Sequence, residues 1–381
     1  MLGWRPSLLL LLGITGLWNL SSAATVSGDA PELQTVARFD HDQPAGIAVS
    51  NEGRIFVTFP RHTGHVDFTV GEVKDGQTTP FPDLEINTPD PARVAQTLFS
   101  VQSLVIDHAD RLWMLDIGVM KVGEPPLAGA PKLVVVDLAL HRTIRTIQIP
   151  AEGLVKNSAL KDFRLDFEQG TGGVAFITDS APGAEALIVL DLASGKAMRR
   201  LSGSVVGPGS GPAPIVEGSP LMVQPKGRPP RPFAVGLNGV ELSRDHSRLY
   251  FNAFTGRRLF DLPARDIANP AVSEDKLRSE VSDDGVIGIA GHLALDASGN
   301  LYVMDMERNA IFRHASDGTV TQLVSSPMLL WPDTMAVSPQ GDLYVTSSQH
   351  NRGPSFHDGV DLRQRPFALY RIHIGAGPVR P

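Results

Sequence analysis

The sequence has no cysteine among its 381 residues, which excludes disulfide bonds, thiolate nucleophiles, iron–sulfur clusters and zinc sites built on cysteine. Aromatic residues make up only 6% of the chain, and the net charge of −7 comes without a long basic run. Because a basic face is the usual footprint of nucleic-acid or anionic-membrane binding, we expect neither partner. Turn-forming residues are abundant, with 37 glycines and 30 prolines. The composition therefore predicts a globular core that is interrupted often by turns.

Residues 1–24 have the pattern of a secretory signal peptide. Arg5 gives a positively charged start, residues 7–20 are largely apolar, and residues 21–24 read Ser-Ser-Ala-Ala, a small-residue cleavage zone. An uncleaved membrane anchor is the alternative, but the apolar stretch is shorter than a bilayer span. We expect cleavage at the end of this segment and a mature chain, residues 25–381, that is secreted or periplasmic and has no membrane anchor.

A repeated segment of fifteen residues determines the expected architecture. Each copy contains a strand of small or branched residues, a polar turn and an apolar or aromatic strand. The ungapped copies are residues 45–59, 102–116, 238–252, 291–305 and 333–347, and a looser copy spans 162–179. Their turns carry the Gly, Asn and Asp residues that β-hairpins require. Further strand-like stretches follow most hairpins, and four strands repeated six times predict an all-β fold, a six-bladed β-propeller.

One strand is left over at each end of this repeat. Residues 367–374 can supply the third strand of the last blade and residues 33–39 its fourth, so strands from both termini would close the ring. The main departure is the segment 202–232, where 14 of 31 residues are Gly or Pro. We interpret it as an excursion between blades three and four, a lid or a disordered loop rather than a domain linker. Residues 25–381 are therefore expected to form a single domain.

The repeat also places a candidate site. In a propeller, the first strand of each blade lines the channel and the second runs antiparallel beside it, so both ends of each copy lie on one face. Polar residues at the starts of first strands are Gln102, Asn238 and Asp333, with Lys161 or Asp162 from the looser copy. Second strands end at positions that include Asp116 and Asp305. A ring of carboxylates, amides and one lysine suits a cation or a polar, amine-bearing ligand.

Two interpretations are open for these polar residues. Asp116 and Asp305 stand at strand ends, where an aspartate often accepts backbone N–H bonds and fixes the next turn. We favour this structural role for both, with ligand binding as the alternative. For Gln102, Asn238 and Asp333 the position facing the channel favours ligand binding.

Other motifs give weaker signals. Trp331 stands close to Asp333 and could form a stacking wall for a ring-bearing ligand or a plug between blades. If the protein is an enzyme, Asp333 with Lys161 is the candidate acid–base pair, and Gln102 is the alternative partner of Asp333. His62 and His65 resemble a metal-binding pair, but their spacing without a carboxylate favours a surface turn. The chain contains no G-x-S-x-G, H-E-x-x-H or P-loop motif.

The sequence resembles the Yellow and major royal jelly protein family, including its bacterial members. The resemblance is carried, in order along the chain, by residues 54–61, 103–118, 136–138, 147–150, 176–179, 238–243, 248–251 and 331–336. It implies a six-bladed propeller, export, and a ligand pocket at one mouth of the channel. Some family members bind biogenic amines and others convert dopachrome. The resemblance therefore implies an aromatic amine or catechol-like ligand, with dopachrome-tautomerase-like activity if the protein is an enzyme, and no required cofactor.

The regucalcin and gluconolactonase propellers are more distantly similar and provide an alternative function, a metal-dependent lactonase that hydrolyses a sugar lactone. Their metal-binding Asn-Gly motif matches the Asn-Gly-Val that begins at Asn238, which makes Asn238 the candidate ligand of a divalent cation such as Ca²⁺. The Glu and Asp ligands of that family fall on Ala45 and Gly291. Because Ca²⁺ requires several oxygens, some of them charged, these losses weaken the metal hypothesis, although Asp333 or Asp305 could compensate.

Overall fold

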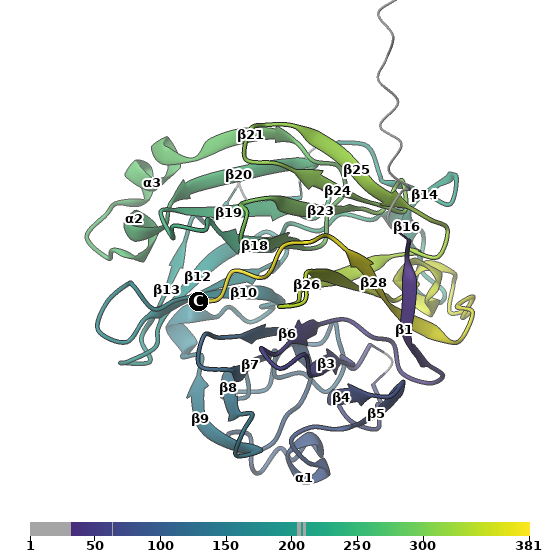
Figure 1. Ribbon diagram of the computed structural model, residues 1–381, viewed down its shortest axis with the longest axis horizontal. Helices are drawn as coiled ribbons and strands as arrows, with labels where there is room; N and C mark the ends of the chain where they lie inside the picture. The colour runs from purple at the N-terminus through teal and green to yellow at the C-terminus, as the bar shows by residue number, and fades with distance from the viewer. Residues whose placement is uncertain (1–31, 63, 204–206, 209–210) are drawn as a thin grey trace, which may run out of the picture. The chain divides into compact units, whose positions relative to one another are not determined.

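The computed structural model describes residues 32–381 except residues 63, 204–206 and 209–210. These residues form six four-stranded antiparallel sheets arranged as the blades of a β-propeller, with innermost strands such as β10 and β18 near the middle and outer strands such as β9 and β21 at the periphery (Figure 1). The six-bladed fold predicted from the repeat is confirmed. The predicted signal peptide, residues 1–24, lies outside the described residues, so its cleavage stays a prediction.

Each of the first five blades is built from consecutive strands. Blade one contains β2 (Ile47–Val49), β3 (Ile55–Thr58), β4 (Val70–Lys74) and β5 (Gln77–Pro80). Blade two contains β6 (Val101–Ile106), β7 (Arg111–Asp116), β8 (Lys132–Asp137) and β9 (Arg142–Gln148). Blade three contains β10 (Leu160–Asp166), β11 (Val174–Asp179), β12 (Ala186–Asp191) and β13 (Ala197–Arg200). The next two contain β18 (Leu237–Leu242), β19 (Arg248–Ala253), β20 (Arg258–Pro263) and β21 (Ser282–Val286), and β22 (Leu293–Leu295), β23 (Leu301–Asp305), β24 (Ala310–His314) and β25 (Val320–Ser325).

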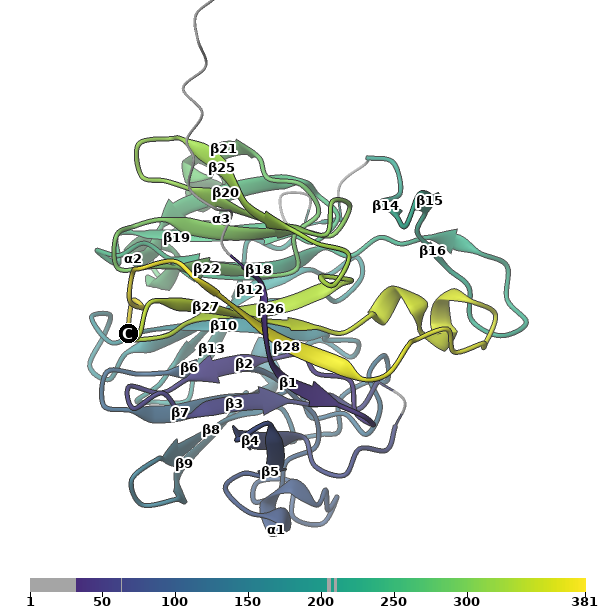
Figure 2. The same cartoon turned by 45° about the vertical axis from the view of Figure 1, so that its right-hand side comes forward.

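The last blade takes strands from both parts of the chain, as the two leftover strands predicted. Its order is β1 (Gln34–Phe39), β28 (Phe367–His373), β27 (Asp342–Ser347) and β26 (Pro332–Val337). Phe39 lies opposite Phe367 in the antiparallel pair, and Figure 2 shows the purple β1 against the yellow β28. This pairing covers an edge of β28 that would otherwise be open.

The same kind of side-chain hydrogen bond recurs in the hairpin turns at the ends of the innermost strands. In five of the six blades the residue that follows this strand is Ser or Asp, and its side chain accepts a backbone N–H from across the turn. Asp107 Oδ1 accepts from Arg111 N at 3.0 Å, and Asp296 Oδ1 accepts from Asn300 N at 2.9 Å. Ser50 Oγ does the same for Arg54 N at 3.0 Å. The polar turns seen in the sequence are therefore fixed locally, which sets the register of each blade.

Apolar side chains pack between neighbouring blades. Trp113 and Leu115 of β7 meet Phe163 and Leu165 of β10 in one buried cluster, and similar clusters fill the other blade interfaces. The outermost strands are more exposed, as the pattern of β9 shows. Helices are short, namely α1 (Leu84–Asn87), α2 (Ala264–Ala268), α3 (Glu274–Glu280) and the single-turn segments η1 (Ala151–Gly153), η2 (His350–Arg352) and η3 (Pro354–Phe356).

Among the described residues, no helix has both the length and the apolar character needed to cross a membrane.

The Gly- and Pro-rich excursion contains two small hairpins. They are formed by β14 (Ile215–Val216) with β15 (Ser219–Pro220), and β16 (Met222–Val223) with β17 (Arg231–Pro232). In Figure 2 the hairpins project on the same side as the turns η2 and η3. Glu217 joins the two segments by accepting from Asn351 Nδ2 at 2.8 Å and Arg352 Nε at 3.1 Å. We call residues 215–232 and 350–362 together the rim.

Candidate functional site

A cavity opens at the channel mouth where the innermost strands begin. Five of the predicted residues line it, namely Gln102, Lys161, Asn238, Trp331 and Asp333. About 120 Å³ of the cavity is accessible to the centres of water-sized molecules, and about 660 Å³ of space lies inside it when its open mouth is included. The residues that were predicted to converge on one mouth of the channel therefore line a single cavity there.

β-bulges place the polar residues that line this cavity. In blade two, Val101 pairs with Asp116 and Ser103 with Leu115, so Gln102 has no partner across the strand. Asn238 is left unpaired in the same way in blade four. Blades three and six skip two residues each, 161–162 and 333–334. Because a bulge redirects side chains and is common beside functional sites, four blades aim their first polar residues at the same space.

Threonines of the second strands replace the ladder bonds that the wider bulges lose. Thr178 Oγ1 accepts from Asp162 N at 2.9 Å and donates to Asn238 O at 2.7 Å. In blade six, Thr346 Oγ1 accepts from the backbone N of Thr334 at 3.2 Å and donates to Ala45 O at 2.7 Å. Each hydroxyl thus accepts from a backbone N–H that has no partner in the bulge, and it donates to a carbonyl of the next blade. These bonds fix the positions of the cavity walls relative to each other.

Aromatic rings form one wall of the cavity. Phe254 and Trp331 are stacked, with ring centroids 5.7 Å apart and planes at 29°. Phe233, which follows the excursion, meets Trp331 edge-on at 5.6 Å. Trp331 is only 4% exposed and has a φ of 55°, a costly conformation for a bulky residue. Trp331 therefore packs between blades and also forms part of the cavity wall, the two roles that the sequence left open.

Asp333 and Lys161 supply the titratable pair that the sequence predicted. Burial raises the pKa of Asp333 to about 6, against the opposing influence of Ser348 and of the charge on Lys161. Burial also lowers the pKa of Lys161, although the carboxylates of Asp333 and Asp179 act in the other direction. A carboxyl group that changes charge near neutral pH thus shares the cavity with a lysine that releases its proton more easily than usual.

Two histidines of the cavity were not predicted as site residues. His62 was expected on a surface turn, but it lines the cavity together with His350, whereas the side chain of His65 is 87% exposed. The His62 and His350 rings lie 4.7 Å apart. Each follows the second strand of its blade, β3 or β27, by a few residues. That shared offset from the repeat was the signal that could have identified them.

Burial keeps both rings neutral. It lowers the pKa of His62 well below its usual value, and it lowers the pKa of His350 to about 3, with the charges of Lys161 and Arg363 acting in the same direction. A neutral imidazole has one donor and one acceptor nitrogen. These rings can therefore form directional hydrogen bonds to a ligand without adding charge.

A buried polar group forms the floor of the cavity. His292 Nε2 lies 3.4 Å from Asp162 Oδ2 and 3.3 Å from Arg164 Nη2. Arg164 also pairs with Asp162 at 3.0 Å and with Glu241 at 2.9 Å. Burial lowers the pKa of His292 to about 4, so this histidine is neutral as well. The group separates the cavity from a second one, because His292 contributes to both.

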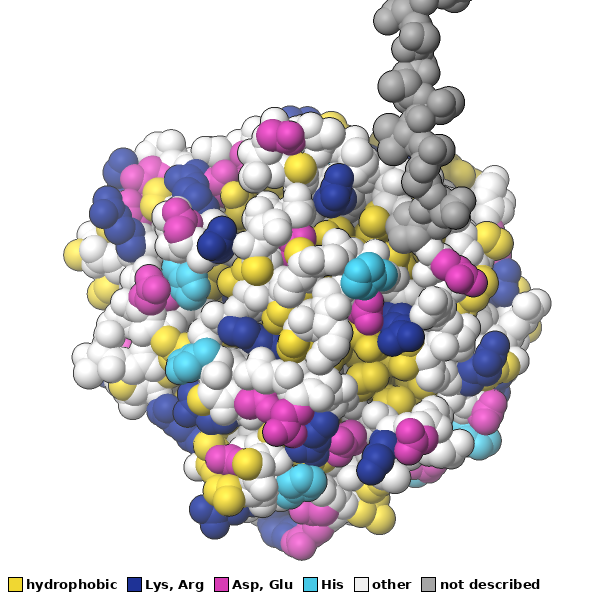
Figure 3. All heavy atoms as spheres, viewed as in Figure 1, with side chains coloured by type: hydrophobic (Ala, Val, Ile, Leu, Met, Phe, Trp, Pro, Cys, Tyr) yellow, Lys and Arg dark blue, Asp and Glu magenta, His cyan; other side chains and the backbone are white. Residues whose placement is uncertain are grey.

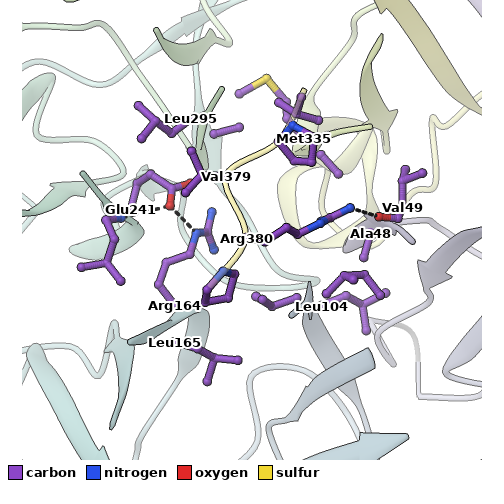
Figure 4. A pocket seen from close by; sticks show the side chains of 18 of the residues that line it. Ala48, Val49, Leu104, Arg164, Leu165, Glu241, Leu295, Met335, Val379 and Arg380 are labelled. Atoms are coloured by element: carbon purple, nitrogen blue, oxygen red, sulfur yellow. Dashed lines mark hydrogen bonds and ion pairs between the residues drawn. The ribbon is translucent and has the colours of Figure 1, made fainter. Parts of the chain in front are cut away.

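The second cavity lies where the innermost strands end, and the last residues of the chain close it (Figure 4). Arg380 donates to Val49 O at 2.6 Å, and His108 N donates to Pro381 O at 3.0 Å. Leu104, Leu295 and other apolar side chains form much of its wall. These apolar side chains share the lining with charged and polar ones such as Arg164, Glu241 and His246.

Asp116 and Asp305 do not line the cavity. Asp116 is fully buried and accepts from Phe99 N and Ser100 N at 2.9 Å each and from Lys132 Nζ at 2.6 Å. Asp305 accepts from Glu307 N at 2.9 Å and from Arg308 at 2.8 Å. Both carboxylates fix the chain around the ends of their strands, which is the role we favoured over ligand binding.

The residues around Asn238 do not fit a divalent cation. Its Nδ2 donates to Gly291 O, and the positions of the two charged ligands are Ala45 and Gly291. In the part of the chain that the structure describes, no three His, Asp or Glu side chains come together as a metal site. Ca²⁺ needs several oxygen ligands, which this position does not assemble.

Solved structures with the same fold include enzymes and a calcium-binding protein. A luciferin-regenerating enzyme aligns with a TM-score of 0.55 and 14% identity over 92% of this chain and 99% of that chain. A putative gluconolactonase aligns with a TM-score of 0.56 and 12% identity over 93% of this chain and 96% of that chain. A regucalcin from Agrobacterium tumefaciens aligns with a TM-score of 0.55 and 14% identity over 91% of this chain and 98% of that chain. At identities this low the likeness shows the fold alone.

Curated relatives come from insects. Protein yellow of Drosophila subobscura is 27% identical over 160 residues, which cover 39% of this chain and 28% of the relative. Major royal jelly protein 7 of Apis mellifera is 25% identical over 185 residues, 48% of this chain and 39% of the relative. Major royal jelly protein 3 of the same species is 22% identical over 302 residues, which cover 74% of this chain and 52% of the relative. The alignments thus span about half or less of each relative.

The family described as Major royal jelly protein matches residues 99–374, from just before β6 in blade two to just after β28 in blade six. The match includes the bulges of blades two, three, four and six that line the cavity. With well over half of its length matched, the chain belongs to the major royal jelly protein family.

Proposed function

We propose that the protein binds a small aromatic molecule with a cationic amine in the cavity at the first channel mouth. The arrangement of Asp333 beside the stacked rings of Phe254 and Trp331 carries this proposal. A carboxylate with a pKa of about 6 is ionised at neutral pH and attracts an ammonium group. Aromatic faces bind cations and stack on flat rings. The amides of Gln102 and Asn238 add hydrogen-bonding groups that suit a polar substituent.

A tautomerase-like reaction on a dopachrome-like substrate is a second candidate. Such a reaction needs one group to remove a proton and another to deliver one on the other side of the ring. Asp333 and Lys161 have pKa values displaced toward neutrality from opposite sides, which suits this exchange. Asp333 would act as the base and Lys161 as the acid.

Matched pairs of compounds test binding. Calorimetric titration compares dopamine with catechol and tryptamine with indole, so that each pair differs by the aminoethyl chain. A charge-assisted hydrogen bond contributes about 1.5–3 kcal/mol, which corresponds to roughly tenfold to a hundredfold tighter binding of the amine. The preference should disappear in Asp333→Asn. Equal affinities within both pairs would contradict the proposal.

Catalysis is tested separately. Conversion of dopachrome is followed by its absorbance with wild type, Asp333→Asn and Lys161→Met, and we expect the rate above background to fall by about a hundredfold in each variant. A protein that binds the amines and leaves dopachrome unchanged would be a binding protein only.

We propose that this site works without a metal or another cofactor. A gluconolactonase-like activity has the support of the shared fold alone, since the residues around Asn238 do not fit the cation. Titration with Ca²⁺ and Zn²⁺ tests this, and a metal-dependent lactonase activity would overturn it.

We also propose an extracytoplasmic location, which rests on the signal-peptide pattern of residues 1–24. Mass spectrometry of the exported protein should find a chain that starts near Ala24. Neither nucleic acid nor membrane is a proposed partner. On the face drawn in Figure 3, acidic and basic side chains are interspersed.

A further inference from the structure

A chain of three side chains outside the cavity ends on His350. Asp361 accepts from Nε and Nη2 of Arg363, each at 2.7 Å, so two oxygens hold the guanidinium. The Arg363 side chain is only 5% exposed, and its Nη1 donates to Gln43 Oε1 at 2.7 Å. Gln43 Nε2 in turn lies 3.1 Å from His350 Nδ1. Gln43 is 5% exposed, so the two contacts that lead from Arg363 to His350 are largely buried, whereas the Asp361 side chain is 35% exposed.

The hydrogen bonds of these three side chains determine which atom of the Gln43 amide faces His350. A guanidinium has donors only, so the amide atom that meets Arg363 has to be the carbonyl oxygen. The atom that faces His350 is then the NH₂ group, which also only donates. His350 Nδ1 must therefore accept this hydrogen bond.

An accepting Nδ1 determines where the imidazole carries its proton. His350 is neutral, because burial lowers its pKa to about 3. A neutral imidazole whose Nδ1 accepts has its proton on Nε2. The ring lines the cavity, and no hydrogen bond to another described residue occupies Nε2.

We propose that this chain of side chains locks His350 in the Nε2–H form, so that it presents a hydrogen-bond donor to an oxygen on the ligand. The inference rests on the proposed function and deepens it. The ligand class is narrowed to aromatic amines that also carry a ring oxygen, such as a phenol or a quinone. Asp361, Arg363 and Gln43 act through His350 as positioning residues. His350 in this form has no lone pair on Nε2 and is not a base there.

The tautomer can be measured without any ligand. In protein with ¹⁵N-labelled histidine, long-range ¹H–¹⁵N correlation spectra distinguish a protonated ring nitrogen from an unprotonated one, and loss of a signal in His350→Gln assigns it. We expect an unprotonated Nδ1 and a protonated Nε2 for His350 at pH 7. A protonated Nδ1 in the wild-type protein would overturn the proposal.

Replacing the amide by a carboxylate reverses the constraint. In Gln43→Glu both oxygens accept, so the hydrogen bond to His350 requires a proton on Nδ1. We expect the ring signals to change to the Nδ1–H form or to the doubly protonated form, with a higher pKa for His350. Gln322→Glu on the exposed strand β25 is the matched control and should leave the His350 signals unchanged. Unchanged signals in Gln43→Glu would also overturn the proposal.

Ligand recognition is measured next with two probes that differ in ring oxygens. We expect wild type to bind dopamine about tenfold more tightly than phenethylamine, and Gln43→Glu to lose most of this difference. If neither amine binds while the Nε2–H form is observed, the proposed function fails and the tautomer assignment stands. If both bind equally to wild type, the amine site stands and the oxygen contact is wrong.

Discussion

Lys161 and Asp333 influence each other's protonation across the cavity although they lie at the starts of the innermost strands of different blades. Burial raises the pKa of Asp333 and lowers the pKa of Lys161, and the charge of each opposes the shift of the other. An ammonium group brought by a ligand would act on Asp333 in the same sense as Lys161 does. Binding of a cation is therefore coupled to release of a proton from this carboxyl group.

This coupling predicts how amine binding depends on pH. Asp333, with a pKa of about 6, must be ionised to attract the amine, so affinity should rise with pH up to about 6 and level off above it. Below pH 6 we expect about a tenfold loss per pH unit. His350 and His292, with pKa values of about 3 and 4, stay neutral between pH 5 and 8 and do not contribute. Calorimetry with dopamine at pH 5, 6, 7 and 8 measures the profile, and Asp333→Asn should flatten it.

Asp333→Asn should make the empty protein more stable at neutral pH. The folded pKa of Asp333, about 6, lies above its ordinary value of 3.8, so the unfolded chain releases this proton first as pH rises. Stability is therefore lost between about pH 4 and pH 6 and stays lower above that range. Allowing for screening through the open mouth, the variant should gain about 1 kcal/mol at pH 7 and nothing at pH 3.5. Urea unfolding at both pH values measures this, and a less stable variant at pH 7 would contradict it.

Trp331 should report on binding through its fluorescence, whereas Trp113 should not. Trp331 lines the cavity, while Trp113 Nε1 donates to Asp107 at 2.8 Å inside a blade interface. In protein that lacks residues 1–24, Trp113→Phe isolates the Trp331 signal, and dopamine should quench it. Trp331→Phe is the matched variant, with no quenching and about threefold to tenfold weaker binding. Quenching that survives in Trp331→Phe would place the ligand elsewhere.

Lys132→Met should destabilise the fold without altering affinity for the ligand. Both Lys132 and Asp116 are fully buried, so the substitution leaves an uncompensated carboxylate, at a cost of about 3–5 kcal/mol. Arg308→Met is the matched control, because Arg308 is 65% exposed where it pairs with Asp305, and its loss should cost less than about 1 kcal/mol. Urea unfolding compares the two, and weaker dopamine binding by folded Lys132→Met would show that this pair reaches the site.

The sequence predicted the propeller because turn chemistry and strand alternation are local properties. Asp107 and Asp296 fix their turns through neighbouring backbone groups, so the hairpins are visible without knowledge of the rest of the fold. The hairpins of the excursion were not predicted. Their stability depends on a distant apolar cluster that includes Val216, Phe254 and Phe356, and Gly and Pro content does not reveal such pairing.

The candidate site was predicted to the extent that strand position determines it. Gln102, Asn238 and Asp333 converge because the offset within the repeat places them at one mouth. That same offset could not separate them from Asp116, whose burial depends on Lys132, a residue of the next strand. The wider bulges of blades three and six depend on hydroxyl contacts of Thr178 and Thr346 with the next blade, which the repeat alignment alone did not reveal.

The closure of blade six has a consequence for how the ring relates to the order of the chain. Gln34 lies opposite Arg371 in the outer pair, so hydrogen bonds between strands close blade six at the periphery, and the residues after β28 return to the second cavity. A circular permutant joined across this pair and opened in another outer hairpin would keep every innermost strand, and with them the bulges around the cavity. The ring has no first blade in any physical sense, and the numbering of the chain is independent of the geometry of the pocket.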